Sequence, residues 1–226
     1  MIPKSLSSTP IGDGNRFSEK IMRQQNVAVA IIAKAPIPGL AKTRLIPAIG
    51  AHAAAVLQER LTEHTVETAL AASVGPVMLW CAPDPSHPSF RDLVARHALT
   101  LKRQPAGDLG ASMLAAMAAS GRSTLVIGTD CPALTPAHLH AAANALRGAE
   151  VVLIPAEDGG YVLIGARTAH PQLFAGIAWG SASVVAETRA RIAALGLASV
   201  ELTSLWDIDT ESDLARFERE HPELAL

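Results

Sequence analysis

Short apolar runs alternate with segments of helical spacing along this chain, and the alternation restricts the folds it can adopt. The runs at residues 27–32, 77–81, 99–101, 123–128 and 151–155 are typical of buried strands. A parallel strand needs a crossover connection, usually a helix, to bring the chain back to the same end of the sheet. We therefore expect one α/β domain, a three-layer α/β/α sandwich with a mostly parallel sheet.

One connection in this pattern is too short for a helix. The run at 161–165 follows the strand at 151–155 after the turn Asp158-Gly159-Gly160, and Asp-Gly is a common hairpin dipeptide. One strand of the sheet is therefore expected to be antiparallel, and a last strand is expected at 198–202. Helices are expected at 50–72 and 181–195, and a closing helix at 210–220 is expected to be capped by Thr210 with Asp213.

Length and composition fit a single domain. The chain has 226 residues, 49% of them hydrophobic and 18% charged. We assign residues 26–226 to the domain and residues 1–25, which are polar and lack the apolar core of a signal peptide, to a flexible N-terminal extension. No apolar run is long enough for a membrane span, and the two cysteines form no CxxC pair, so a cytoplasmic location is predicted. The net charge of −2 argues against a general nucleic-acid-binding surface.

The loop after the first strand combines positive charge with a restricted backbone. Its cations are Lys34, Lys42 and Arg44, and between them stand Pro36, Pro38 and Gly39. The prolines fix φ and the glycine permits a positive φ. In open α/β sheets ligands bind at the carboxyl ends of the strands, where this loop lies. A stiff, positively charged loop suits a polyphosphate ligand.

Carboxylates follow two later elements at the same edge. Asp130 comes directly after the strand at 123–128 and is well placed to hold Mg²⁺ or Mn²⁺, although capping of a turn explains it equally well. Asp207 and Asp209 precede a helix, where capping alone accounts for carboxylates. Together with Asp130, Asp209 becomes a candidate second metal ligand.

Three further features have both a functional and a plainer interpretation. The turn at 158–160, with Tyr161 after it, is a hairpin whose Asp158 is also a candidate ligand-binding group. Asp108 is expected to cap the helix that follows, where the backbone amides near Gly110 are able to meet a phosphate or nucleotide. Trp179 either packs in the core or stacks on a base or sugar.

Several familiar motifs are missing. The spacing of a phosphate-binding P-loop is absent around Lys42, no G-x-G-x-x-G follows the first strand, and no G-x-S-x-G is present. Cys131 is better explained as a small buried residue than as a nucleophile.

Taken in order, these segments resemble the nucleotide-diphospho-sugar transferase superfamily, which has the GT-A-type fold. The closer resemblance is to a bacterial glycosyltransferase-like family, associated with radical-SAM proteins and related to phospholactate guanylyltransferase. The resemblance rests on residues 33–36, 38–39, 42–45, 128–132, 158–161, 179, 207–210 and 213–214, which together span nearly the whole chain.

The resemblance implies a role for each segment. The first loop would bind the base and phosphates of a nucleotide, Lys42 and Arg44 would hold the phosphates, and Asp130 and Asp209 would hold Mg²⁺ or Mn²⁺. Asp130, Lys42 and Arg44 are thus the expected catalytic residues. The expected nucleotide-binding residues are Ala33, Lys34, Pro36, Gly39, Lys42, Arg44, Asp108 and Gly110, and those facing the acceptor or sugar are Asp158, Gly159, Gly160, Tyr161 and Trp179.

Two departures from the family patterns leave the reaction type open. Many GT-A glycosyltransferases carry Asp-x-Asp where this chain has Asp130-Cys131-Pro132, a form closer to nucleotidyltransferases. The Gly-rich opening loop of nucleotidyltransferases is here replaced by a Pro-rich one. We expect glycosyl transfer from a sugar nucleotide to a small acceptor. The alternatives are nucleotidyl transfer to a phosphorylated small molecule and a non-catalytic nucleotide-binding module. Exposed strands or Trp-bearing helices could also build a homodimer.

Overall fold

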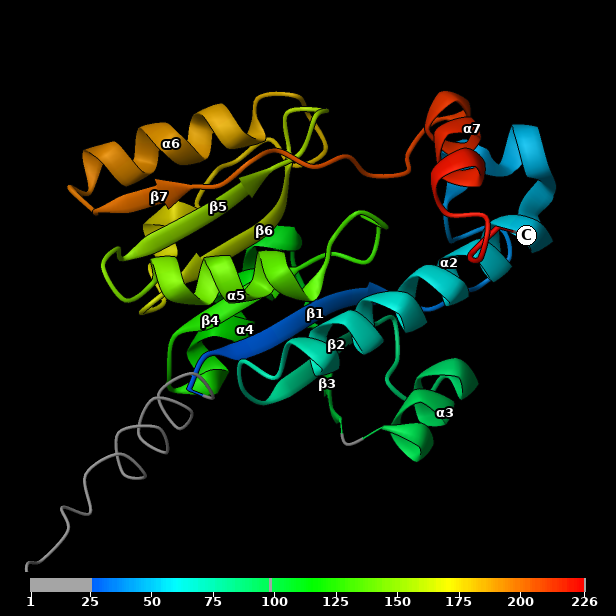
Figure 1. Cartoon of the computed structure of the whole chain (residues 1–226), viewed down its shortest axis with the longest axis horizontal. Helices are drawn as coiled ribbons and strands as arrows, with labels where there is room; N and C mark the ends of the chain where they lie inside the picture. Colours follow the sequence, from blue (N-terminus) through cyan, green and yellow to red (C-terminus); the bar gives the residue numbers. More distant parts are fainter. Residues whose placement is uncertain (1–25, 98, 226) are drawn as a thin grey trace, which may run out of the picture.

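The computed structural model describes residues 26–97 and 99–225 and contains a seven-stranded sheet in the order β3-β2-β1-β4-β6-β5-β7 (Figure 1). The predicted extension at 1–25 lies outside the described residues. The strands are β1 (Ala28–Lys34), β2 (Val77–Ala82), β3 (Thr100–Arg103), β4 (Thr124–Ile127), β5 (Val151–Pro155), β6 (Tyr161–Ala166) and β7 (Ser199–Glu201).

The predicted mixture of parallel and antiparallel pairing is confirmed. β1 pairs in parallel with β2 and β4, β2 with β3, and β5 with β7. β6 runs antiparallel to both of its neighbours, β4 and β5, and the hairpin at Asp158-Gly159-Gly160 produces this reversal. Because β6 is reversed, its first residue, Tyr161, lies at the same edge as the carboxyl ends of β1 and β4.

Helices cover both faces of the sheet. They are α2 (Ile46–Ala72), α3 (Pro88–Arg96), α4 (Leu109–Ser120), α5 (Pro136–Ala145), α6 (Val184–Ala194) and α7 (Glu211–Glu220). Alternate residues of β1 show the layering: Val29 and Ile31 pack with α2, α3 and α5, whereas Ala28 and Ala30 pack with α4 and α6. The predicted α/β/α sandwich is thus confirmed, and β1 is buried on both faces over residues 28–31, as a central parallel strand requires.

Two helices begin elsewhere than the sequence pattern indicates. α2 starts at Ile46 rather than at Gly50, because Pro47 favours a helix start, but Gly50 interrupts it with a φ of 80°. α6 starts at Val184 rather than at Ser181. Gly180 has a φ of 79°, and Ser181 donates its hydroxyl to the Ala178 carbonyl, so this segment forms a turn instead.

A separate small core lies at the carboxyl edge of the sheet, where α7 packs beside the start of α2 (Figure 1). Its buried members are Leu45, Leu57, Leu61, Trp206, Ile208, Leu214 and Phe217. Leu45 follows Arg44 in the chain, and Ile208 stands between Asp207 and Asp209. The small core therefore anchors two of the loops that the sequence marked as functional.

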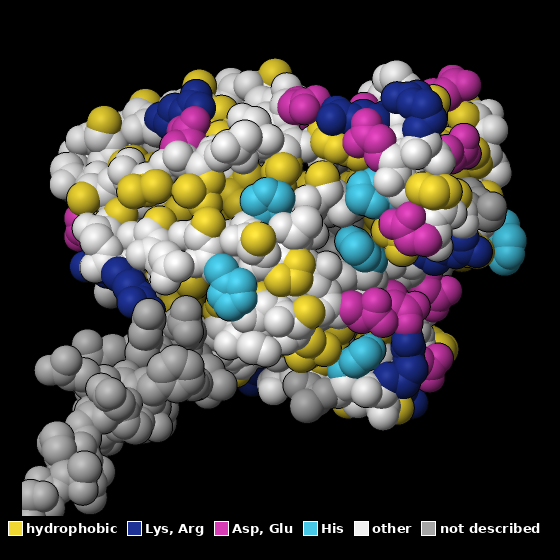
Figure 2. Space-filling view, in the orientation of Figure 1, with side chains coloured by type: hydrophobic (Ala, Val, Ile, Leu, Met, Phe, Trp, Pro, Cys, Tyr) yellow, Lys and Arg dark blue, Asp and Glu magenta, His cyan; other side chains and the backbone are white. Residues whose placement is uncertain are grey.

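The surface carries charges of both signs. On the face that Figure 2 displays, basic side chains stand beside acidic ones and do not gather into a single basic area. Among residues 26–97 and 99–225, no helix is both long enough and apolar enough to cross a membrane.

Candidate functional site

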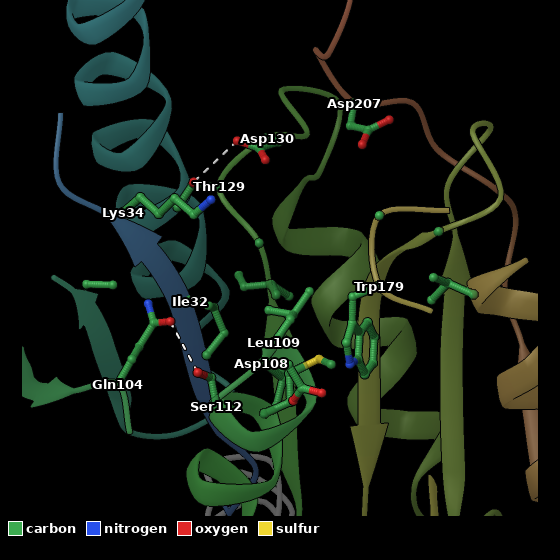
Figure 3. Close-up of a pocket in the computed structure, with 18 of the residues that line it drawn as sticks. Ile32, Lys34, Gln104, Asp108, Leu109, Ser112, Thr129, Asp130, Trp179 and Asp207 are labelled. Atoms are coloured by element: carbon green, nitrogen blue, oxygen red, sulfur yellow. Dashed lines mark hydrogen bonds between the residues drawn. The ribbon is translucent and has the colours of Figure 1, made fainter. Parts of the chain in front are cut away.

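A cavity of about 1020 Å³ opens at the carboxyl edge of the sheet (Figure 3). It is lined by the loops that follow β1, β2, β3 and β4, by the β5–β6 hairpin, by residues 179–181 and 184, and by the segment before α7. Among the lining residues are these predicted ones: Lys34, Lys42, Arg44, Asp108, Asp130, Asp158, Gly160, Tyr161, Trp179 and Asp209.

Lys42 links two loops from opposite parts of the sequence. Its Nζ lies 2.7 Å from Asp130 Oδ1 and donates to the Ile208 carbonyl at 2.7 Å, and its side chain is only 4% exposed. The backbone of Lys42 is left-handed, with a φ of 46°, which is uncommon for a residue with a side chain. The loop thus holds the ammonium group against the carboxylate, and Lys42 is an internal counter-ion in the free protein.

Arg44 and Asp209 form a second ion pair at the mouth of the cavity, and both side chains are partly exposed. The backbone around Asp209 is fixed by the cap of α7: the amides of Asp209 and Thr210 both donate to Asp213 Oδ2. The capping role predicted for Thr210 and Asp213 is confirmed. Each carboxylate predicted to bind metal is therefore already paired with a cation of the same chain.

Asp207 is a lining residue that the sequence analysis did not assign to the site. It lies across the top of the cavity from Asp130 (Figure 3). Burial, reinforced by the nearby carboxylates of Asp158, Asp130 and Asp209, raises the pKa of Asp207 to about 6. The sequence alone did not reveal this placement, because the burial of Ile208, which turns its neighbours on both sides away from the core, is a tertiary feature.

The loop that carries Asp130 is held from two sides. Gln58 of α2 is buried and donates from Nε2 to Thr129 Oγ1 at 2.9 Å. The Ile208 amide donates to the Asp130 carbonyl at 2.9 Å. Burial raises the pKa of the Cys131 thiol to about 12, which makes it inert as a nucleophile, as expected.

At the β3 end of the cavity, Gln104 joins three elements. Its Nε2 donates to the carbonyls of Ala33 and Trp80, both at 2.9 Å, and its Oε1 accepts from Ser112 Oγ at 3.2 Å (Figure 3). Neither Gln104 nor Ser112 was predicted, because single polar residues separated by a loop carry no recognisable spacing. Asp108 caps α4 as predicted, accepting from the Ala111 amide at 2.8 Å.

Two aromatic residues form the opposite wall. The rings of Tyr161 and Trp179 meet edge to face with centroids 6.4 Å apart. Burial raises the pKa of the Tyr161 phenol well above its usual range. Asp158 Oδ1 accepts from the Gly160 amide at 2.8 Å, which fixes the carboxylate beside this wall.

Five predicted residues do not line the cavity: Ala33, Pro36, Gly39, Gly110 and Gly159. Two of them have identifiable packing roles. A side chain on Gly110 would come within 2.7 Å of the Trp179 ring, and one on Gly159 within 2.2 Å of the Ala182 carbonyl. Ala33 is buried, and its carbonyl accepts from Gln104. Gly39 has the positive φ, 85°, that the loop was expected to need.

Solved structures place this architecture in a known class. A candidate nucleotide-diphospho-sugar transferase from Desulfovibrio desulfuricans G20 matches with a TM-score of 0.78 and 26% identity, over 87% of this chain and 89% of that one. A nucleotidyl transferase from Methanothermobacter thermautotrophicus matches with a TM-score of 0.62 and 16% identity, over 88% and 99%. A CMP:2-keto-3-deoxy-manno-octonic acid synthetase complexed with CTP matches with a TM-score of 0.54 and 11% identity, over 88% of this chain and 99% of that one. The last two share the fold alone. The 26% identical match makes the protein a transferase-class enzyme, and it has the nucleotide-diphospho-sugar transferase fold.

The family follows from the sequence. Residues 65–181, just over half of the chain, match the family described as "Uncharacterized protein conserved in bacteria (DUF2064)", and the chain belongs to that family. No curated protein matches the chain.

Proposed function

We propose that the protein is a metal-dependent transferase that moves a glycosyl group from a sugar nucleotide to a small acceptor. One observation carries this proposal: a single cavity is lined by the basic loop, by five aspartates and by an aromatic wall. Open α/β sheets bind their ligands at this edge. The match to the candidate nucleotide-diphospho-sugar transferase, at 26% identity, favours glycosyl over nucleotidyl transfer.

The basic loop would bind the diphosphate. A leaving nucleoside diphosphate gains negative charge as its bond to the sugar breaks, and cations that neutralise this charge lower the barrier. Lys42 and Arg44 line the cavity, but each is paired with an aspartate in the free protein. We propose that the donor's phosphate oxygens compete with Asp130 and Asp209 for these two cations.

The carboxylates of the cavity would supply only part of the ligand shell of a divalent cation. Mg²⁺ and Mn²⁺ take oxygen ligands, and on phosphates they commonly use only one or two protein carboxylates. Among the described residues no group of three or more His, Cys, Asp or Glu could hold a metal, so phosphate oxygens would have to complete the shell. The pKa of Asp207 is raised first by burial and then by the nearby carboxylates, whose negative charge a cation would offset.

We propose Asp130 and Asp209 as the ligands, because both carboxylates are released when phosphate oxygens take up Lys42 and Arg44. Asp207 lines the same cavity. When bound, the metal would supply positive charge to the phosphates.

A thermal-shift screen tests the proposal. Nucleoside triphosphates, nucleoside diphosphates and sugar nucleotides are each added with and without Mn²⁺, and a ligand that binds the native state raises Tm. We expect a Mn²⁺-dependent rise with one sugar nucleotide and its diphosphate. Asp130→Asn is expected to lose the Mn²⁺-dependent part. Lys102→Met, on the exposed strand β3, serves as the matched control and should keep it.

The alternatives give different results. A rise confined to a triphosphate would indicate nucleotidyl transfer instead. Binding of a sugar nucleotide without turnover against any acceptor would contradict glycosyl transfer to a small acceptor. If no nucleotide raises Tm, the assignment of the cavity as a donor site is wrong.

A further inference from the structure

The cavity has walls of unequal charge. Its four lining cations lie on the β1 and β3 side: Lys34, Lys42, Arg44 and Arg103. The opposite wall, from the β5–β6 hairpin to the start of α6, is formed by Asp158, Gly160, Tyr161, Val162, Trp179, Gly180, Ser181 and Val184. Among the residues that the structure describes, Asp158 is the only acidic or basic side chain lining this wall.

The basic residues of the neighbouring elements are bound elsewhere. Arg189 forms a two-bond pair with Glu201, and Arg191 donates to the Ala175 carbonyl and pairs with Glu187. Arg167 donates to the Leu146 carbonyl. Across the described part of the chain, no arginine or lysine from β6, α6 or the segment between them lines the cavity.

Three of the four cations on the other wall have partners or a proposed role. Lys42 and Arg44 belong to the proposed diphosphate site, and Arg103 pairs with Asp84 and donates to the Pro83 carbonyl. The fourth, Lys34, lies across the cavity from Trp179 (Figure 3). A phosphate monoester bound against the aromatic wall would meet the Asp158 carboxylate without a compensating cation. Like charges brought together at a binding site strongly disfavour the complex.

The same wall suits an uncharged ring. Trp179 and Tyr161 present aromatic surface, and Gly110 permits the close packing of α4 against the Trp179 ring. The C–H faces of a sugar or cyclic polyol pack well on aromatic rings. Asp158 Oδ1 already accepts from Gly160, and its second oxygen is left to accept a hydrogen bond from a hydroxyl group.

We propose that the acceptor is a neutral polyhydroxyl molecule, such as a sugar or cyclic polyol, and not a phosphate monoester. This inference rests on the proposed glycosyl transfer. In that reaction the acceptor oxygen forms a bond to the sugar's anomeric carbon while the bond from that carbon to the diphosphate oxygen breaks. The nucleoside diphosphate leaves with the electron pair, and the hydroxyl proton passes to the Asp158 carboxylate.

The test uses pairs of probes that differ in one phosphate. A panel of neutral sugars and polyols, each paired with its own phosphate monoester, is added to the full-length protein, alone and with the nucleoside diphosphate that gives the largest thermal shift. Saturation-transfer NMR detects weak binding of each probe. We expect at least one neutral probe to bind about tenfold or more tightly than its phosphate partner, with ring protons receiving the transfer.

Three single-residue variants test where the neutral and phosphate probes bind. Trp179→Ala should abolish the neutral probe's signal, whereas Trp179→Phe should retain part of it. Asp158→Asn preserves the hydrogen bond to Gly160 and removes the charge, so it should raise the affinity for the phosphate probe. Unfolding curves on all three variants separate a local effect from loss of the fold.

Three results would overturn the inference: tighter binding of the phosphate probes in wild-type protein, no signal from any neutral probe, or a neutral signal unchanged by Trp179→Ala. The nucleotide screen keeps the two proposals distinguishable. A protein that binds a sugar nucleotide but prefers phosphate monoesters refutes only the acceptor assignment. A protein that binds no nucleotide refutes the proposed function.

Discussion

At the scale of single residues, the site depends on ion pairs between side chains far apart in the sequence. Lys42 is almost completely buried and joins the β4 loop to the segment before α7 through Asp130 and the Ile208 carbonyl. A buried cation with two partners is costly to remove, because the groups left behind lose their compensation.

We expect Lys42→Met to lower the free energy of unfolding by about 1–3 kcal/mol and to weaken binding of a nucleoside diphosphate at least tenfold. Methionine fills a similar volume without the charge. Urea denaturation gives the first quantity and isothermal titration the second. Lys102→Met, at an exposed position outside the cavity, is the control. Undiminished diphosphate binding by Lys42→Met would show that this ammonium never leaves Asp130.

The raised pKa of Asp207 predicts that the stability of the fold depends on pH. Burial and neighbouring carboxylates raise its pKa from an ordinary 3.8 to about 6, so the folded state holds this proton more tightly than the unfolded chain does. Stability is therefore lost as the pH rises from about 4 to about 6. In metal-free buffer Asp207→Asn should be more stable than wild type at pH 7, by about 1–2 kcal/mol after allowance for partial exposure, and equal to it below about pH 4. A gap that stays constant across this range would contradict the assignment.

At the scale of elements, α4 and the loop carrying Trp179 are fitted to each other through Gly110. A Cβ at this position would lie 2.7 Å from the Trp179 ring and 3.0 Å from Phe174 Cβ. Neither contact is relieved by rotating a flexible side chain, so the helix or the ring has to move.

Gly110→Ala is expected to lower stability by about 1–3 kcal/mol, despite the better helix propensity of alanine, and to weaken binding at the aromatic wall. Thermal unfolding and probe binding measure the two effects. At Gly148 a Cβ would meet nothing within 4 Å, and Gly148→Ala should have little effect on either. Equal behaviour of the two variants would mean that Trp179 is not constrained by α4.

At the scale of the whole molecule, the phosphate end of the cavity rests on the small core between α7 and the start of α2. Phe217 is completely buried there, together with Leu45 and Ile208. This core is separate from the two cores that flank the sheet, so it can loosen while the sheet remains folded.

Phe217→Ala should therefore cost about 3 kcal/mol and speed amide hydrogen exchange at residues 206–214 far more than in β1. Nucleotide binding should weaken, although no side chain of the cavity is changed. Hydrogen exchange followed by mass spectrometry resolves the two regions. A uniform increase over the whole sheet would indicate instead that the small core does not open independently.

The proposed boundaries of the extension, the cytoplasmic location and the homodimer stay predictions. The fold was largely predictable because its signals are local. Apolar runs marked the strands, Asp158-Gly159-Gly160 marked the antiparallel hairpin, and Thr210 with Asp213 marked the cap of α7. Helix starts were harder to locate where glycine conformations at 50 and 180 decide them.

By itself, the sequence determined which segments meet at the carboxyl edge of the sheet, because strand and turn patterns depend on neighbouring residues. It could not determine how side chains pair there. Lys42 with Asp130, and Arg44 with Asp209, are separated by many residues along the chain, and their pairing follows from strand order and packing. The tertiary structure alone placed Asp207 and Gln104 in the cavity and turned Gly110 into a packing constraint for Trp179. Contacts of this kind depend on distances in space, which residue patterns along a single chain do not encode.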